Sequence, residues 1–152
     1  MSLRERLDAE MKTALREKDT LKLSTIRMIK SAMRYKETEP GAKGPLDEAG
    51  ILSVVTSEIK KRRDAIVEFE KGGRPDLKEK EEAELSILKG YLPEQLSESE
   101  LVALVEEAVA TTSAKGPKDM GAVMKVLSPK TQGRAEGRVV SDLVKKKLSS
   151  LS

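Results

Sequence analysis

The residues of this chain whose chemistry is most suggestive are cations that lie close to glycines and other small residues. On a helix, Lys118 and Lys125 would lie two turns apart, with Gly121 and Ala122 between them on much the same face. Cations beside a backbone that carries only small side chains suit contacts with phosphate groups. The candidate nucleic-acid-binding residues are Lys118, Lys125, Lys130, Arg134 and Arg138. The alternative interpretation is that these cations only keep a helical surface solvated, and the sequence leaves both open.

Charge is unevenly distributed along the C-terminal part, although the formal net charge of the whole chain is only +3. Residues 115 to 152 contain nine Lys and Arg against three Asp and Glu, a net +6, whereas residues 93 to 114 contain five Glu and no cation. A polyanion responds to such a local excess of cations. We interpret Lys145, Lys146 and Lys147 differently, as complements to the C-terminal end of a helix dipole. The sequence thus predicts an acidic helix followed by a basic C-terminal module.

A second group of charged residues interrupts two apolar stripes in the N-terminal part. Arg62 and Arg63 lie where the stripe of one helix should continue after Ile59, and Glu81 and Glu84 interrupt the next helix. If the turn between the two helices makes them antiparallel, the arginines come level with Glu84. We expect a partly buried ion pair among these four residues. Binding of a partner by the arginines is the alternative interpretation.

The residue types that most enzymes use for catalysis are scarce in this chain. It has no His, no Cys and no glycine loop of the Walker type. Without Cys there are no disulfides, thiol nucleophiles or thiolate metal ligands. The spacing of Ser and Lys residues places no base beside a hydroxyl. We therefore expect no catalytic residue, no metal site and no cofactor in this chain on its own.

The elements that must position these residues are predicted to be helices throughout. Aromatic residues make up 2% and charged residues 36% of the chain, a composition that favours solvated helices packed through aliphatic side chains. Gly and Pro residues predict an exposed loop between 39 and 45. Asp47 is expected to cap one helix, and Ser97 with Glu100 forms a capping-box pattern at the start of another. A loop is expected from Pro129 to Gly137.

Pro93 predicts a boundary between two domains, because it stops one helix shortly before the next begins. We expect a helical N-terminal bundle over residues 1–92 and a small three-helix domain over residues 93–152. No apolar run approaches the roughly 20 residues that span a bilayer, and the first residues lack the apolar stretch of a secretory signal. We therefore expect a cytoplasmic protein with no membrane partner.

Several segments of the sequence resemble the GatB/YqeY family. They are Leu23-Ser-Thr-Ile-Arg-Met28, Glu58-Ile-Lys-Lys-Arg-Arg-Asp-Ala-Ile66, Tyr91-Leu-Pro-Glu-Gln-Leu96, Asp119-Met-Gly-Ala-Val-Met124 and Gly133-Arg-Ala-Glu-Gly-Arg138. The resemblance implies a helical N-terminal domain and a small helical C-terminal domain similar to the tail of GatB, the B subunit of the tRNA-dependent amidotransferase. That tail is associated with tRNA. Family descriptions also imply carbon–nitrogen ligase activity with glutamine as amido donor, although that chemistry belongs to regions of the amidotransferase that this sequence does not contain.

The residues and the resemblance together lead to one hypothesis and two alternatives. The hypothesis is a non-catalytic accessory module that binds tRNA through its basic C-terminal domain. Because the tail has no aromatic residue, binding should depend on shape and phosphate and not on base stacking. The first alternative is an adaptor whose N-terminal helices dock a partner, such as an enzyme that handles aminoacyl-tRNA. The second is participation in carbon–nitrogen ligation together with such a partner.

Overall fold

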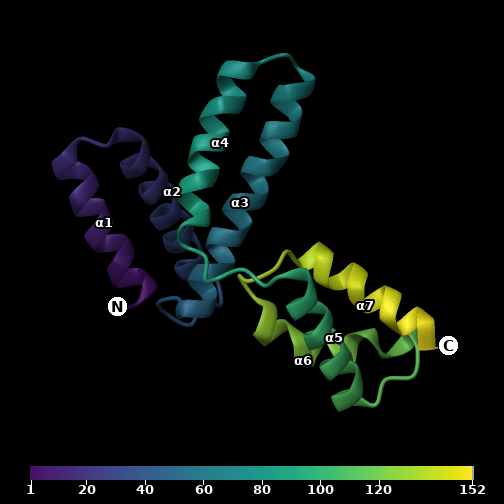
Figure 1. Ribbon diagram of the computed structural model, residues 1–152. Helices are drawn as coiled ribbons and strands as arrows, with labels where there is room; N and C mark the ends of the chain where they lie inside the picture. Colours follow the sequence, from purple (N-terminus) through teal and green to yellow (C-terminus); the bar gives the residue numbers. More distant parts are fainter. Residues whose placement is uncertain (152) are drawn as a thin grey trace. The chain divides into compact units, whose positions relative to one another are not determined.

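The computed structural model describes residues 1–151, and every regular element in that range is helical (Figure 1). The all-α prediction is therefore confirmed. The chain divides into two compact units, Met1–Leu92, called unit 1 below, and Pro93–Ser152, called unit 2. Each unit has its own cluster of buried apolar side chains. In the range that is described, none of the helices combines the length and the apolar character that crossing a bilayer requires.

Unit 1 consists of two helical hairpins, the second longer than the first (Figure 1). Its helices are α1 (Leu3–Glu17), α2 (Thr20–Glu37), α3 (Glu48–Lys71) and α4 (Pro75–Lys89). Ser2, Asp19 and Asp47 cap α1, α2 and α3, because their side-chain oxygens each accept a hydrogen bond from a backbone N–H of the first turn. The expected cap at Asp47 is confirmed.

The turn between α3 and α4 makes the second hairpin antiparallel. Gly73 has a φ of +65°, in the left-handed region where a side chain would be strained. Pro75 lies in the first turn of α4, where its missing N–H removes no helical hydrogen bond. The tip of this hairpin projects away from α1 and α2 (Figure 1). The part of α3 nearest its start and the part of α4 nearest its end therefore supply the contacts with the first hairpin.

The core of unit 1 is aliphatic and lies where the two hairpins meet. Its fully buried members include Leu7 of α1, Ile26 and Ile29 of α2, Val55 of α3 and Leu88 of α4. Burying one such side chain contributes about 1.5–3 kcal/mol to the free energy of folding. The core thus fixes the start of α3 and the end of α4 on α1 and α2.

Unit 2 is a bundle of three α-helices with one short 3-10 helix. Its elements are α5 (Glu98–Thr112), η1 (Pro117–Asp119), α6 (Met120–Thr131) and α7 (Gly137–Leu151). The capping box of α5 is confirmed: Ser97 Oγ accepts from the N–H of Glu100, and the Glu100 carboxylate accepts from the N–H of Ser97. Leu101, Val123 and Val144 lie in the core.

Helix α6 continues past Pro129, where the sequence predicted the start of a loop. A proline ring removes one backbone donor, but other contacts hold the last turn of α6. Thr131 is buried, and its hydroxyl donates to the carbonyl of Leu127 at 3.4 Å. The N–H of Gln132 donates to the carbonyl of Ser128 at 2.9 Å. The predicted loop is therefore wrong for residues 129 to 131.

Candidate functional site

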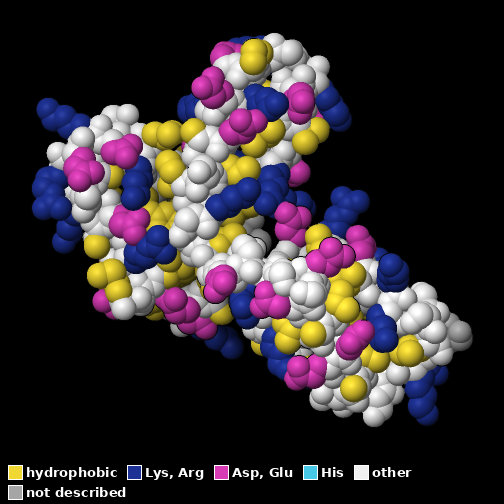
Figure 2. All heavy atoms as spheres, in the orientation of Figure 1, with side chains coloured by type: hydrophobic (Ala, Val, Ile, Leu, Met, Phe, Trp, Pro, Cys, Tyr) yellow, Lys and Arg dark blue, Asp and Glu magenta, His cyan; other side chains and the backbone are white. Residues whose placement is uncertain are grey.

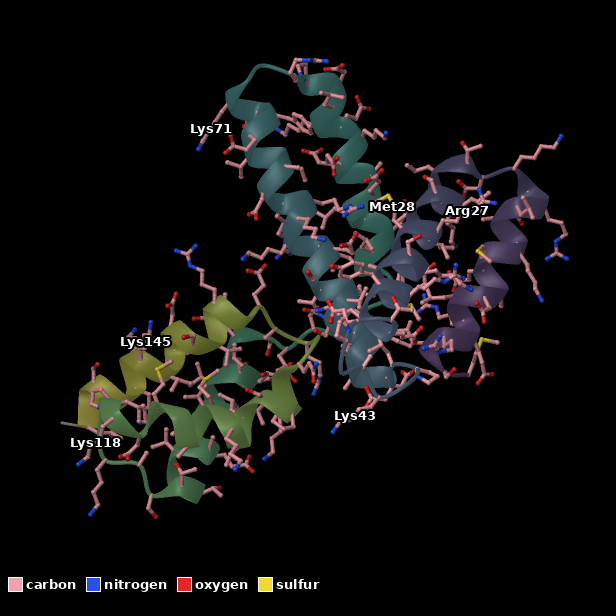
Figure 3. The ribbon with its side chains drawn as sticks, turned by 180° about the vertical axis from the view of Figure 1, so that it is seen from behind. Arg27, Met28, Lys43, Lys71, Lys118 and Lys145 are labelled. Atoms are coloured by element: carbon pink, nitrogen blue, oxygen red, sulfur yellow. The ribbon has the colours of Figure 1, made fainter. Side chains whose placement is uncertain are left out.

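Lys118 lies in η1 and Lys125 lies in α6, the helix that follows η1 directly. Both side chains are exposed, and neither forms a hydrogen bond or an ion pair with residues 1–151. Gly121 and Ala122 between them are also exposed, and no neighbouring group lies within 4 Å of the place a Cβ would take on Gly121. In Figure 3, Lys118 points away from the unit. We call the exposed residues of η1 and α6 from Lys118 to Lys125 the Lys118–Lys125 face.

The backbone at the start of this surface is hydrogen-bonded within the chain. No side chain caps either η1 or α6, but the N–H groups of Asp119 and Met120 donate to the carbonyls of Gly116 and Pro117. The neighbouring carboxylate of Asp119 is turned towards Lys115, whose backbone N–H donates to it at 2.8 Å. The positive charge of the Lys118–Lys125 face therefore comes from its two lysine side chains.

Lys130 and Arg134 are engaged in contacts within unit 2. Lys130 Nζ lies 3.1 Å from the carboxylate of Glu107 on α5. Arg134 Nε donates to the carbonyl of Glu94 at 3.1 Å, and the carbonyl of Arg134 accepts from the N–H of Leu96 at 2.9 Å. Arg134 thus holds the segment before α5 against the unit, and Lys130 offsets part of the acidic charge of α5.

Arg138 lies beyond the C-terminal end of α6, whereas Lys118 lies before its N-terminal end. Lys118 precedes the 12-residue helix α6, which is about 18 Å long, and Arg138 follows it in the first turn of α7. The Arg138 side chain is exposed and has no hydrogen bond or ion pair with the described residues. The structure therefore leaves Lys118 and Lys125 exposed on consecutive elements, and it does not bring the five predicted cations into one cluster.

Lys145, Lys146 and Lys147 do not end the last helix. Helix α7 continues to Leu151, and its last turn contains no cation. The favourable effect of a cation on a helix dipole falls off beyond the last turn. The interpretation of these lysines as a complement to the helix end is therefore wrong.

In unit 1, Arg62 lies among buried carboxylates. Its Nη1 lies 3.0 Å from Oε1 of Glu58, one turn earlier on α3. Its Nε lies 3.4 Å from Oε2 of Glu84 and 4.0 Å from Oε2 of Glu81, both on α4. The side chains of Arg62, Glu58 and Glu84 are 7%, 9% and 7% exposed. We call these four residues the Arg62 cluster.

The Arg62 cluster joins three helices of unit 1. The antiparallel hairpin brings Arg62 level with Glu84, and Arg62 Nη2 lies 3.4 Å from the sulfur of Met28 on α2 (Figure 3). Arg63 beside it is half-buried. Sequence reasoning missed Glu58, because a glutamate four residues before an arginine usually marks an exposed pair on a helix surface. The contacts of Arg62 are those of a structural residue at the crossing of α2, α3 and α4.

A second polar cluster that sequence reasoning missed surrounds Tyr91. Its hydroxyl donates to Glu10 at 2.9 Å, and its ring centre lies 4.7 Å from the guanidinium carbon of Arg6. Glu10 also lies 2.7 Å from Arg6 and 3.2 Å from Lys22. Burial alone would raise the pKa of Glu10, but hydrogen bonds from Arg6, Tyr91 and Lys22 outweigh it and lower that pKa. Burial, together with Glu10, raises the pKa of the Tyr91 hydroxyl.

The carboxylates of the described range are not arranged for metal binding. Within residues 1–151, no group of three or more His, Cys, Asp or Glu side chains could hold a metal ion. The glutamates that do converge, in the Arg62 cluster, surround a guanidinium group.

Comparison with known protein families assigns this all-helical chain to one of them. The family described as YqeY-like protein matches residues 4–148. The chain belongs to the YqeY-like protein family, as the resemblance of its sequence segments indicates.

Similar proteins occur in fungi and carry the name Altered inheritance of mitochondria protein 41, mitochondrial. The one from Pyrenophora tritici-repentis is 34% identical over 148 residues, 96% of this chain and 78% of that protein. The one from Lachancea thermotolerans is 35% identical over 113 residues, 73% of this chain and 60% of that protein. The one from Saccharomyces cerevisiae is 35% identical over 95 residues, 62% of this chain and 51% of that protein. The chain thus spans about half to three fifths of the length of these two yeast relatives.

The names of these relatives contradict the expected cytoplasmic location. They are named as mitochondrial proteins. The expectation rested on the absence of a secretory signal and of a long apolar run, but sequences that direct proteins to mitochondria are amphipathic and need neither. The prediction of a cytoplasmic protein is therefore wrong.

Proposed function

We propose that this chain is a non-catalytic accessory protein that binds tRNA through the Lys118–Lys125 face of unit 2. The observation that carries the proposal is the pair of exposed cations, without ion pairs among residues 1–151, on either side of the exposed residues Gly121 and Ala122. Cations beside exposed backbone attract phosphate groups. The proposal includes a similarity of unit 2 to the tail of GatB, which the family resemblance implies.

The number of available cations sets the strength of the proposed binding. Because Lys130 is paired with Glu107 and Arg134 holds the segment before α5, phosphate contacts come from Lys118 and Lys125, with Arg138 at a distance. Two or three phosphate contacts predict a weak affinity whose logarithm falls with log salt at a slope of about −1.4 to −2.7. Unit 2 contains no Phe, Tyr or Trp, so stacking on bases does not contribute.

The test is the affinity of the full chain for a tRNA transcript, measured by fluorescence anisotropy at low salt, where electrostatic attraction is least screened. The double variant Lys118→Glu/Lys125→Glu should lose about tenfold or more in affinity. Preference among different tRNAs should change little, because phosphate contacts carry no sequence information.

A matched control separates a binding surface from a simple effect of net charge. Lys12→Glu/Lys43→Glu changes the net charge by the same amount, at two exposed lysines of unit 1, and should keep the affinity of the unchanged protein. An equal loss of tRNA affinity in both double variants would mean that only the net charge of the protein affects binding. Absence of tRNA binding by the unchanged protein at low salt would reject the proposal.

Docking of a partner protein by unit 1 is the second candidate function, favoured by a hollow between α2 and α3. The hollow has a volume of about 520 Å³, and Tyr35, Leu46 and Val54 are among its lining residues. Tyr35 is 70% exposed, and aromatic residues often anchor protein contacts. An adaptor would lose an aminoacyl-tRNA-handling enzyme on Tyr35→Ala and keep it on Lys118→Glu/Lys125→Glu. A part in carbon–nitrogen ligation would require the partner to supply the catalytic groups.

A further inference from the structure

Unit 2 has an open apolar groove between α5 and α7 that the proposed function does not use. Two hollows, of about 330 and 230 Å³, follow one another along these helices and share Leu143. The apolar side chains of this α5–α7 groove are Leu96, Leu101, Val102, Val105, Val139 and Leu143. Val102 is 36% exposed and Val139 is 46% exposed. Val102 and Val139 thus leave apolar side chains in contact with water along the groove.

The two sides of the groove differ in charge. Glu98 and Glu106 of α5 line one side. Lys146 and Lys147 of α7 line the other side, where Arg134 and Glu136 also lie before α7 begins. None of these four residues of α5 and α7 forms an ion pair with another residue of the described range, although Glu106 and Lys146 line the same hollow. On unit 2, Figure 2 shows apolar side chains next to both acidic and basic ones. The groove therefore presents an apolar floor between an acidic side on α5 and a second side that is basic along α7 and carries both charges just before α7 begins.

We propose that the α5–α7 groove binds an amphipathic helix of a partner protein. The apolar stripe of that helix would lie on the groove, with basic residues along the edge next to α5 and acidic residues along the edge next to α7. An RNA strand does not fit this surface, because its phosphates would meet Glu98 and Glu106. The pattern of charge thus favours a helix with one basic edge and one acidic edge.

The dimensions of the groove suit a helix of about three turns. Glu98 lines one hollow together with Val139, and Glu106 lines the other together with Lys146, so α5 and α7 run in the same direction. From Val139 to Ser150, the groove follows α7 for about 16 Å. A helix seated between two helices of a bundle packs as an additional helix, which is a common mode of peptide recognition.

The test uses three side-chain-stapled helical peptides of about 12 residues that share one leucine stripe. The first has one edge of Lys and one edge of Glu, the second has Lys on both edges, and the third has Glu on both edges. A helix can bind in either direction, so swapping the edges of the first peptide would not discriminate. By fluorescence anisotropy, the full chain should bind the mixed peptide about three- to tenfold more tightly than either of the others.

Protein variants then locate the binding site. Val139→Glu places a charge on the apolar floor at an exposed position and should abolish binding of the mixed peptide. Val67→Glu, at a valine of α3 that is 47% exposed, is the matched control and should leave binding of the mixed peptide unchanged. Lys146→Glu/Lys147→Glu makes both sides of the groove acidic, so the peptide with two Lys edges should become the tightest of the three.

Three results would overturn the proposal. The first is that none of the peptides binds the full chain. The second is that peptide binding does not respond to Val139→Glu. The third is a dimer in sedimentation that Val139→Glu dissociates, because the groove would then be occupied by a second copy of the chain.

Discussion

Replacement of Arg62 by alanine is expected to destabilise unit 1 strongly. The substitution removes the cation between Glu58 and Glu84, whose side chains are 9% and 7% exposed. Breaking a buried ion pair by removing one partner costs about 3–5 kcal/mol, because the other charge stays buried without compensation. An exposed pair costs under about 1 kcal/mol. Glu58 keeps an ion pair with Lys61 at 3.0 Å, but Glu84 loses its cation, so we expect the free energy of unfolding to fall by about 3–5 kcal/mol.

The assay follows unit 1 alone within the full chain. Both tyrosines, Tyr35 and Tyr91, lie in unit 1, and unit 2 has no aromatic residue. Urea unfolding followed by tyrosine fluorescence therefore reports unit 1, whereas far-ultraviolet circular dichroism reports both units. With a urea dependence of about 1–3 kcal/mol per molar, the fluorescence midpoint of Arg62→Ala should fall by about 1–5 M, and the transition of unit 2 should not move.

Two further variants test the cause of the loss. Lys60→Ala, at an exposed position two residues away, should change the free energy of unfolding by less than about 0.5 kcal/mol. The triple variant Glu58→Gln/Arg62→Met/Glu84→Leu removes all the buried charges and should recover most of the stability. The reasoning is refuted if Arg62→Ala costs less than about 1 kcal/mol, or if the triple variant is no more stable than Arg62→Ala.

Three smaller predictions concern the connecting loop, the Tyr91 cluster and the start of α5. Trypsin should cut first after Lys43, which is exposed in the loop between α2 and α3 and points away from unit 1 (Figure 3); Lys43→Gln should remove that early fragment from a mass spectrum. Folding lowers the pKa of Glu10, so its stabilisation is present above the ordinary value of 4.5 and lost as pH falls through the folded pKa. In acid titrations followed by tyrosine fluorescence, Glu10→Gln should therefore reduce the loss of stability. Ser97→Ala should destabilise unit 2 by about 1 kcal/mol in circular dichroism melts.

Features that depend on neighbouring residues could be predicted from the sequence. The caps at Asp47 and Ser97 and the turn at Gly73 follow from side-chain and backbone chemistry within a few residues. The contact of Arg62 with Glu84 could also be predicted, because charged residues interrupt the apolar stripes of two helices that a short turn makes antiparallel. The end of α6 could not be predicted, since burial of Thr131 outweighs the local effect of Pro129.

Features that depend on which helix faces meet could not be predicted from the sequence. No sequence spacing relates Tyr91 to Glu10, 81 residues earlier, and only the packing of α1 near the end of α4 joins them. For the same reason, the sequence does not show that the five candidate cations differ in their contacts. Lys130 meets Glu107 of α5 and Arg134 meets Glu94, whereas Lys118 and Lys125 have no partner among residues 1–151.

The most direct test of the proposed tRNA binding is the salt dependence of tRNA affinity when Lys118 and Lys125 are neutralised. If each lysine contacts one phosphate, Lys118→Gln/Lys125→Gln should make the slope of log affinity against log salt shallower by about 1.4–1.8. The matched change Lys12→Gln/Lys43→Gln in unit 1 should leave the slope unchanged. A slope that Lys118→Gln/Lys125→Gln does not alter would contradict the proposal, because the Lys118–Lys125 face would then contact no phosphate.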